Sequence, residues 1–278
     1  MMLVSCVLIS YNQEDTIIQA LESIFSQTYS NYEVIISDDC SADKTFSLIH
    51  NFINSLSEEF RGRITHLNQN ASNLGISRHV EVALSKAQGE LVALFAGDDI
   101  SLSNRLEFAV PFFEDELVMS YTSNVSLLFP DDSIKTIHDR NLHSAIYSLD
   151  DFVKLFGTKN QVIFNGCSAI YRRNVLTRLS ERPIDVEDIT LMFHSLILGK
   201  LVCDQRISVQ YRVGNSQQAT SKMGFISRLI VIDHYAGLLL ENKVPICYLK
   251  SLIVPAIYKE FLHLRLSFVS LLGLCFLL

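Results

Sequence analysis

Residues 7–45, VLISYNQEDTIIQALESIFSQTYSNYEVIISDDCSADKT, contain two short apolar runs that each end abruptly in polar side chains. The first run ends in Ser-Tyr-Asn at residues 10–12, and the second ends in Ser-Asp-Asp at residues 37–39. Between the two runs, apolar residues recur at helical spacing over residues 17–25. This order of strand, helix and strand predicts a βαβ unit with two parallel strands.

The same alternation continues to about residue 110 and weakens beyond it. The further segments are, in chain order, a helix over 46–53, a strand over 61–69, a helix over 77–89 that ends at Gly89, strands over 90–99, 118–129 and 165–173, a helix over 187–199 that ends at Gly199, an edge strand over 206–212, and helices from 222 on. The repetition predicts an α/β fold: a mostly parallel mixed sheet flanked by helices, with C-terminal helices. We expect one domain over 1–218 and a helical extension over 219–278.

The composition narrows the classes of function. A formal charge of -7, from 23 basic and 30 acidic residues without a basic cluster, argues against a nucleic-acid partner. Six scattered cysteines, with no C-x-x-C pair and no signal-peptide pattern, favour a cytoplasmic location. The apolar segment LRLSFVSLLGLCFLL (264–278) is shorter than the ~20 residues that span a bilayer. We expect it either to pack as a helix, on the domain or on the partner of a homodimer, or to contact the inner membrane peripherally.

Three predicted strands end in polar residues, at 10–12, 37–39 and 97–99. Because ligands bind outside the carboxyl ends of the strands in open α/β sheets, these residues are expected to converge on one site. The adjacent carboxylates of Asp98 and Asp99 repel each other unless they are solvated or bridged by a cation, and oxygen ligands suit Mg2+ or Mn2+. On this motif alone, a metal site and a solvated turn are equally good interpretations.

The acidic segment SDDCSADKT (37–45) also has two interpretations. Ser41 or Asp43 is expected to cap the following helix. Asp38 and Asp39 lie too early for that role, which leaves at least one of them for a ligand. A carboxylate here accepts a hydrogen bond from a base imide N–H, which is one way to prefer uracil or thymine.

Glu187 and Asp188 stand at the start of a predicted helix. The first interpretation is that they interact favourably with the helix dipole, and the second is that one of them is a general base. The sequence has no dinucleotide-binding glycine fingerprint, no P-loop and no nucleophile elbow, so the corresponding enzyme classes are poorly supported.

Taken together, five blocks resemble the family 2 glycosyltransferases and come in the family's order. They are LISYNQEDTIIQALESIFSQTYSNYEVIISDDCSADKT (8–45), NLGISRHVEVALSKAQGELVALFAGDD (73–99), NGCSAIYRRNVL (165–176), VEDITLMFHSLILGK (186–200) and VQYRVGNS (209–216). Each block is weak alone, whereas five in order are a strong signal. The resemblance implies a GT-A fold, with a nucleotide-sugar-binding half over 1–110 and an acceptor-binding half over 111–218. It also implies transfer with inversion, and the absence of a Q-x-x-R-W stretch favours non-processive transfer of single sugars.

The resemblance also implies roles for individual residues. The nucleotide-sugar would be bound by Ile9, Ser10, Tyr11, Asp39, Asn73, Gly75, Arg78 and Asp98. Asp99 would bind the metal ion, Mn2+ or Mg2+. Asp188 matches the second acid of the family's E-D pair, the usual general base, and Glu187 matches its neighbour.

Two positions depart from the family pattern. Ala96 stands where the family often has an acid, and the tail block lacks a histidine for which Arg212 or Ser216 would substitute. The implied reaction moves one sugar from a UDP- or dTDP-sugar to a hydroxyl of a glycan or lipid-linked acceptor, in bacterial surface polysaccharide synthesis. The alternatives are a degenerate nucleotide-binding protein without transferase activity and a nucleotidyltransferase; the latter is disfavoured because no glycine-rich basic loop follows the first strand.

Overall fold

The structure is a computed structural model that describes residues 1–136, 145–151, 164–176 and 187–214, with side chains from Leu191 on in the last range. The chain divides into two compact units, residues 1–148 with 163–216 and residues 149–162 with 217–278. All elements below belong to the first unit. The predicted C-terminal helices and the apolar segment 264–278 lie outside the described residues.

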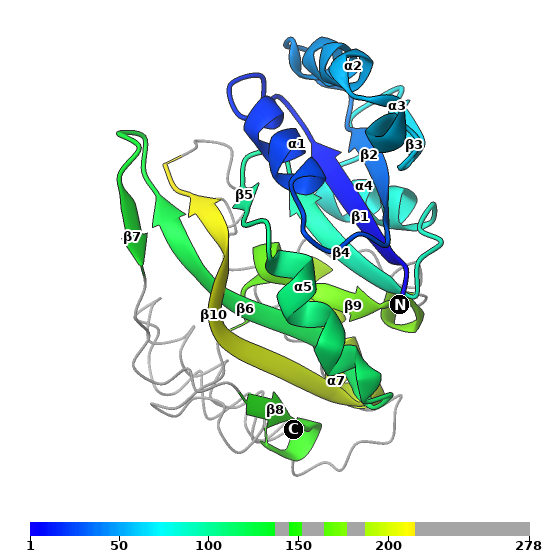
Figure 1. The fold of residues 1–278 in the computed structure, drawn as a ribbon, viewed down its shortest axis with the longest axis vertical. Coiled ribbons are helices and arrows are strands. Elements are labelled where there is room, and N and C mark those ends of the chain that lie inside the picture. The colour runs from blue at the N-terminus through cyan, green and yellow to red at the C-terminus, as the bar shows by residue number, and fades with distance from the viewer. Residues whose placement is uncertain (137–144, 152–163, 177–186, 215–278) are drawn as a thin grey trace, which may run out of the picture. The chain divides into compact units, whose positions relative to one another are not determined.

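The first part of the chain forms the predicted alternation of strands and helices (Figure 1). Its elements are β1 (Val4–Ser10), α1 (Ile17–Phe25), β2 (Tyr32–Asp38), α2 (Thr45–Ser55), α3 (Glu58–Arg61), β3 (Ile64–Gln69), α4 (Ile76–Leu84) and β4 (Leu91–Ala96). The strands lie in the order β3-β2-β1-β4, and each neighbouring pair is parallel. The carboxyl ends of all four strands therefore lie at one edge, which we call the carboxyl edge.

The second part of the sheet is mixed. Its elements are β5 (Ile100–Ser101), α5 (Arg105–Ala109), the 3-10 helix η1 (Val110–Glu114), β6 (Val118–Leu128), β7 (Ile134–Thr136), β8 (Ala145–Tyr147), the 3-10 helix η2 (Gly166–Ser168), β9 (Ile170–Arg172), α7 (Glu187–Leu198) and β10 (Lys200–Arg212). Strand β9 is antiparallel to both β4 and β6, and β10 is parallel to β6. Strand β10 consequently runs in the same direction as β4 and ends at the carboxyl edge. In the described residues, the ten strands form one sheet.

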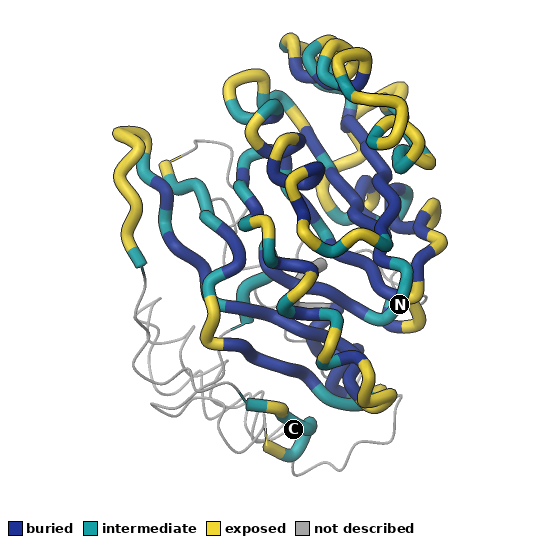
Figure 2. Tube along the Cα trace, in the orientation of Figure 1, coloured by how far each residue is buried: buried dark blue, intermediate teal, exposed yellow. Residues whose placement is uncertain are grey.

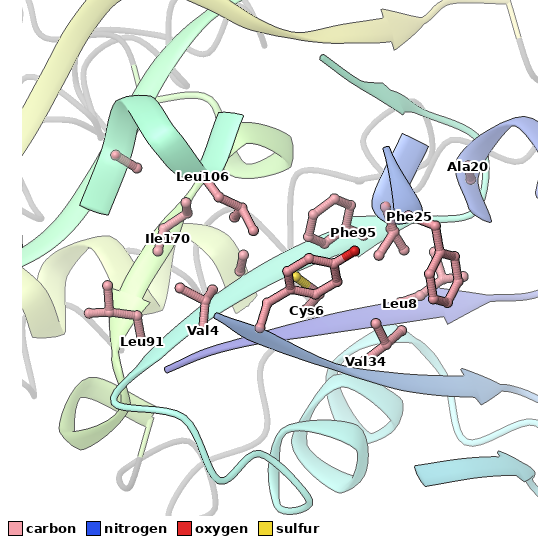
Figure 3. Close-up of a cluster of buried hydrophobic side chains, with 14 of the residues drawn as sticks. Val4, Cys6, Leu8, Ala20, Phe25, Val34, Leu91, Phe95, Leu106 and Ile170 are labelled. Carbon is pink, nitrogen blue, oxygen red and sulfur yellow. The ribbon is translucent and has the colours of Figure 1, made fainter. Parts of the chain in front are cut away.

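Apolar side chains cover both faces of the parallel strands. On one face, side chains of β1 such as Cys6 and Leu8 pack with Phe25 of α1 and Phe95 of β4 (Figure 3). On the other face, Val7 packs with residues of α4. Figure 2 shows that the central strands are buried along most of their length, whereas β7 is mainly exposed. Burial on both faces explains why these strands are continuous apolar runs rather than alternating ones.

Three predicted elements show the largest differences from the observed ones. Helix α4 ends at Leu84 rather than at Gly89, because the amide groups of Gln88 and Gly89 turn to donate to the buried Glu33 carboxylate of β2, at 2.7 and 3.2 Å. A Cβ atom at Gly89 would lie 2.6 Å from the Leu3 carbonyl oxygen, so the glycine serves this close approach instead of a helix end.

The other two differences lie in the second part of the sheet. The segment 165–173, predicted as one strand, begins with η2 and becomes a strand only at Ile170. The segment 206–212, predicted as an edge strand, is the end of the longer β10. Strand β10 pairs with β6 on one side and with β8 and β5 on the other, so it is not an edge.

Candidate functional site

The polar ends of three strands lie side by side at the carboxyl edge, as predicted. Ser10, the last residue of β1, is in register with Asp38, the last residue of β2. On the other side of β1, the Gly97 amide donates to the Ile9 carbonyl at 3.0 Å. The strand register thus brings residues 10–12, 37–39 and 97–99 together at one place in the structure.

Asp38 is fully buried and organises this edge. Its carboxylate accepts hydrogen bonds from Ser10 Oγ at 3.0 Å, from the amide and hydroxyl of Ser41 at 2.9 and 2.5 Å, and from Gln69 Nε2 at 2.9 Å. These bonds connect the ends of β1, β2 and β3. Because a buried carboxylate is costly unless it is satisfied in this way, we assign Asp38 a role within the protein. Ser41, one of the two expected helix caps, instead bridges Asp38 and the Asn12 amide, which donates to Ser41 Oγ at 2.8 Å.

Asp39 is also buried and holds the loop that precedes α4. Its Oδ1 accepts from Asn70 Nδ2 at 2.8 Å and from the Leu74 amide at 2.9 Å, and its Oδ2 accepts from the Gly75 amide at 3.1 Å. Gly75 has a φ of +76°, a conformation that favours glycine. The Asn73 side chain accepts a further bond from the Gly75 amide at 2.8 Å. The structure therefore brings together three of the predicted binding residues, Asp39, Asn73 and Gly75.

The loop after β1 is fixed by the loop after β2. The Gln13 amide donates to Thr45 Oγ1 at 2.7 Å, and the Ala42 amide donates to Asn12 Oδ1 at 2.9 Å. Asp43, the other expected cap, accepts from the Thr45 amide at 2.9 Å at the start of α2. Between these fixed residues Tyr11 is 39% exposed.

Three other predicted binding residues differ in exposure. Ile9 and Asp98 are half-buried at the ends of β1 and β4. The Arg78 side chain lies on the exposed first turn of α4, where it forms an ion pair with Glu81. Gly75 immediately precedes this helix, which begins at Ile76, and the described contact of the Arg78 side chain is with Glu81 rather than with the strand ends.

Asp99 is buried in the turn between β4 and β5. Burial, and to a lesser degree the neighbouring carboxylate of Asp98, raise the pKa of Asp99 to about 7. The Arg212 amide donates to Asp99 Oδ1 at 3.0 Å. Arg105 lies fully buried nearby, where Nη1 donates to Ser101 Oγ at 2.8 Å, and its charge partly offsets the effect of burial on Asp99.

The acidic pair fits a divalent cation that is held mainly by its substrate. In the described part of the chain, no group of three or more His, Cys, Asp or Glu side chains is arranged to hold a metal ion. Two adjacent carboxylates are suited to a cation that takes one or two protein oxygens and completes its shell with phosphate and water. Asp98 and Asp99 match that requirement.

Sequence reasoning missed the residues that hold the site from within. His79 on α4 is buried, with Nε2 at 2.9 Å from Ser37 Oγ. Asn70, Gln69 and Arg105 likewise act through contacts between segments that are distant in sequence. For His79 a signal existed, because it directly follows the NLGISR segment; no local pattern indicates the others.

His79 predicts a specific pH dependence of stability. Burial lowers the pKa of His79, although the Asp39 and Asp38 carboxylates act in the opposite direction. Its unfolded-state pKa, about 6.5, is therefore the higher one, and the unfolded chain binds more protons below that pH. This contribution to stability is complete above about pH 6.5 and is lost as the pH falls through it. Urea unfolding measures the free energy of unfolding at pH 8 and at pH 5.5. This free energy is expected to fall more between the two pH values for wild type than for His79→Gln, and an equal fall in both proteins would contradict the role of His79.

The predicted catalytic acids stand at the start of α7. The backbone of the helix begins at Glu187, immediately followed by Asp188, and their side chains lie outside the described residues. The helix ends at Leu198, two residues before β10 begins at Lys200, and its packed residues include Leu191 against β9 and β6. Twelve residues of helix extend about 18 Å from that point. We therefore propose, rather than observe, that the Asp188 side chain reaches the site.

Comparisons with known proteins agree with this geometry. The putative glycosyltransferase EpsE of Bacillus subtilis (strain 168) is 36% identical over 111 residues, which are 40% of this chain and 38% of EpsE. The UDP-Glc:alpha-D-GlcNAc-diphosphoundecaprenol beta-1,3-glucosyltransferase WfaP of Escherichia coli is 35% identical over 124 residues, 45% of this chain and 46% of WfaP. The matched region spans less than half the length of both relatives.

Two solved structures share the fold. The crystal structure of S. aureus TarS 1–349 in complex with UDP-GlcNAc has a TM-score of 0.72 at 16% identity, covering 94% of this chain and 73% of that chain. The mannosyltransferase PcManGT from Pyrobaculum calidifontis, in complex with GDP-Man and Mn2+, has a TM-score of 0.61 at 16% identity, covering 98% and 78%. The expected GT-A fold is confirmed.

None of the described helices is long and apolar enough to cross a membrane.

The family assignment rests on a match to more than half of the chain. Residues 5–179 match the family described as Glycosyl transferase family 2. This range contains every strand end of the carboxyl edge except that of β10, and it includes the loops built around Asp38 and Asp39. The chain belongs to glycosyl transferase family 2.

Proposed function

We propose that this protein is an inverting glycosyltransferase that moves one sugar from a UDP- or dTDP-sugar to a hydroxyl of a glycan or lipid-linked acceptor. The observation that carries the proposal is the alignment of residues 10–12, 37–39 and 97–99 at one edge of the parallel sheet. This arrangement offers an aromatic face, carboxylates and an acidic pair at the place where α/β sheets bind nucleotides.

Donor binding falls to the first half of the chain, residues 1–110. Tyr11 offers its exposed ring to the base, and Asp39 is the acceptor for a base imide N–H. Asp39 is already ordered by the amides of Leu74 and Gly75, so the base meets a preformed site with a low ordering cost. Ile9, Ser10, Asn73, Arg78 and Asp98 complete the proposed donor-binding set.

The reaction requires stabilisation of the leaving nucleoside diphosphate and activation of the acceptor. Mn2+ or Mg2+ bound at Asp99 would supply positive charge to the departing phosphate. Asp188 would accept the proton of the acceptor hydroxyl, with Glu187 beside it. Attack on the face opposite the leaving group needs one base and no enzyme nucleophile, so the configuration at the anomeric carbon inverts.

The acceptor half is assigned to residues 111–218. WfaP is by its name an enzyme for a diphosphoundecaprenol-linked acceptor, and TarS is by its name a poly(ribitol-phosphate) N-acetylglucosaminyltransferase. These relatives support a lipid-linked or polymeric acceptor and a role in bacterial surface polysaccharide synthesis. The scattered cysteines support a cytoplasmic protein. The apolar segment 264–278 supports contact with the inner membrane, and the alternative is that this segment packs on the partner of a homodimer.

A turnover assay separates this proposal from a degenerate nucleotide-binding protein. We expect wild type with Mn2+ to release UDP or dTDP from a nucleotide-sugar, at a rate that EDTA abolishes. The matched control is Asp15→Asn, which removes an exposed carboxylate from the first loop and should leave the rate unchanged. Nucleotide binding by calorimetry without any donor turnover would favour the degenerate alternative, and release of pyrophosphate from UTP or dTTP in the presence of a sugar 1-phosphate would favour a nucleotidyltransferase.

A further inference from the structure

Arg212, the last residue of β10, makes three hydrogen bonds at the acidic pair. Its amide donates to Asp99 Oδ1 at 3.0 Å, its Nε donates to the Asp98 carbonyl at 2.9 Å, and its Nη2 donates to Gln19 Oε1 on α1 at 2.6 Å. One residue therefore connects the end of β10, the turn between β4 and β5, and the helix that follows β1. In Figure 1, β5, the strand that follows this turn, lies between β10 and α1.

The bond to the Asp98 carbonyl has a particular geometric effect. This carbonyl belongs to the peptide unit between Asp98 and Asp99, and a peptide unit is planar. Holding its oxygen fixes the plane and hence the directions in which both side chains leave the backbone. The rest of the turn is held by the Gly97 amide on the Ile9 carbonyl and by Thr16 Oγ1 on the Gly97 carbonyl, at 3.0 and 2.8 Å. The N–H of the Asp98–Asp99 peptide, which is the Asp99 amide, donates to the Ala96 carbonyl at 3.3 Å, and Arg212 Nε holds the carbonyl side of the same peptide.

The partners of the Arg212 side chain in these bonds are uncharged oxygens. Their recognition depends on the planar, forked donors of the guanidinium more than on its charge, and a lysine ammonium cannot reproduce that fork. The positive charge of Arg212, taken alone, would weaken metal binding. A cation beside Asp99 repels a second cation, so its removal would strengthen metal binding if position did not matter.

We propose that Arg212 is a positioning residue that orients Asp98 and Asp99 for the divalent cation through the forked contacts of its side chain. The inference rests on the proposed role of Asp99 as the metal ligand. Partners that orient the ligands of a metal typically contribute 10- to 100-fold to its affinity.

The test measures Mn2+ binding by electron paramagnetic resonance at saturating UDP, in the full chain. Arg212→Gln and Arg212→Lys are both expected to weaken Mn2+ binding at least ~10-fold. UDP affinity in EDTA is expected to stay within about twofold of wild type, because the side chain orients the acids and does not bind the phosphate. Gln19→Leu, a substitution of an exposed residue that removes the acceptor of the Arg212 Nη2 bond and keeps the Nε bond to the Asp98 carbonyl, is expected to give an intermediate loss of Mn2+ affinity.

Arg206→Gln is the matched control. Arg206 lies on the same strand and is bonded to the buried carboxylate of Asp204, so its loss should lower the unfolding temperature without changing Mn2+ affinity. Unchanged or tighter Mn2+ binding in both Arg212 variants overturns the proposal. Wild-type Mn2+ affinity in Arg212→Lys, or a loss of metal-free UDP binding alongside the loss of Mn2+ binding, overturns it in favour of a direct contact with the diphosphate. Wild type that binds no Mn2+ with UDP refutes the metal role of Asp99 itself, and the inference falls with it.

Discussion

Replacing Asp188 by asparagine is expected to lower kcat by about 10²- to 10⁴-fold, the usual contribution of a general base. Asparagine keeps the size and hydrogen-bonding shape of the side chain but cannot accept the proton of the acceptor hydroxyl. Because Asp188 begins α7 rather than a loop of the carboxyl edge, nucleotide affinity should stay within about twofold. Steady-state kinetics with a UDP-sugar, together with calorimetry of UDP binding, measures both quantities.

Glu187→Gln is the matched comparison for Asp188→Asn. Both substitutions remove one negative charge from the first turn of the same helix, so any effect of the helix dipole on stability should be similar, at about 0.3–1 kcal/mol. A base role for Asp188 predicts that Asp188→Asn loses far more activity than Glu187→Gln. Equal and small losses in the two variants would show that these acids serve the dipole only, and a joint loss of transfer and nucleotide binding would also contradict the assignment.

Asp99→Asn is expected to weaken Mn2+ binding at saturating UDP by about 10²-fold or more, since it removes the charged oxygen ligand of the cation. The variant should fold normally. Its side-chain oxygen can still accept the Arg212 amide, and a neutral side chain at this buried position avoids the cost of burying a charge. Turnover should fall in parallel with metal affinity and recover in part at high Mn2+.

The control for this substitution is again Asp15, an exposed carboxylate of the loop between β1 and α1. Asp15→Asn should retain the Mn2+ affinity of wild type because Asp15 is exposed and lies outside the acidic pair. Unchanged Mn2+ binding in Asp99→Asn would contradict the proposed metal site. Loss of thermal stability instead of metal affinity would indicate that Asp99 serves mainly as the acceptor of the Arg212 amide.

The parallel half of the fold was predictable because its signals are local. The apolar runs of β1, β2 and β4 and the helical spacing of α1 and α2 are visible within windows of ten residues, and the structure confirms them. The end of α4 was not predictable, since it is set by Glu33, a residue of β2 that lies 55 positions away from Gln88. The same reason applies to β10, because pairing on both sides leaves no mark in the sequence of one strand.

The site was predictable only as a set of strand ends. Because parallel strands share one carboxyl edge, the convergence of residues 10–12, 37–39 and 97–99 followed from the βαβ pattern. The hydrogen-bond partners of the two adjacent acids did not follow. Asp38 is occupied by four hydrogen bonds from three segments, and only tertiary structure reveals that. The hydrogen bonds from Arg212 to the Asp98 carbonyl and to Gln19 of α1 are likewise visible only in the tertiary structure.

The most direct measurement is a thermal unfolding titration of wild type and Asp39→Asn with UDP, dTDP and GDP in Mn2+, because a ligand that binds the folded chain raises its unfolding temperature by mass action. We predict that UDP or dTDP stabilises wild type more than GDP does. The amide that replaces the Asp39 carboxylate should reduce that stabilisation to the level of a roughly tenfold weaker ligand. A wild type that none of the three nucleotides stabilises, or an Asp39→Asn variant that UDP stabilises equally well, would contradict a pyrimidine-nucleotide site at the carboxyl edge.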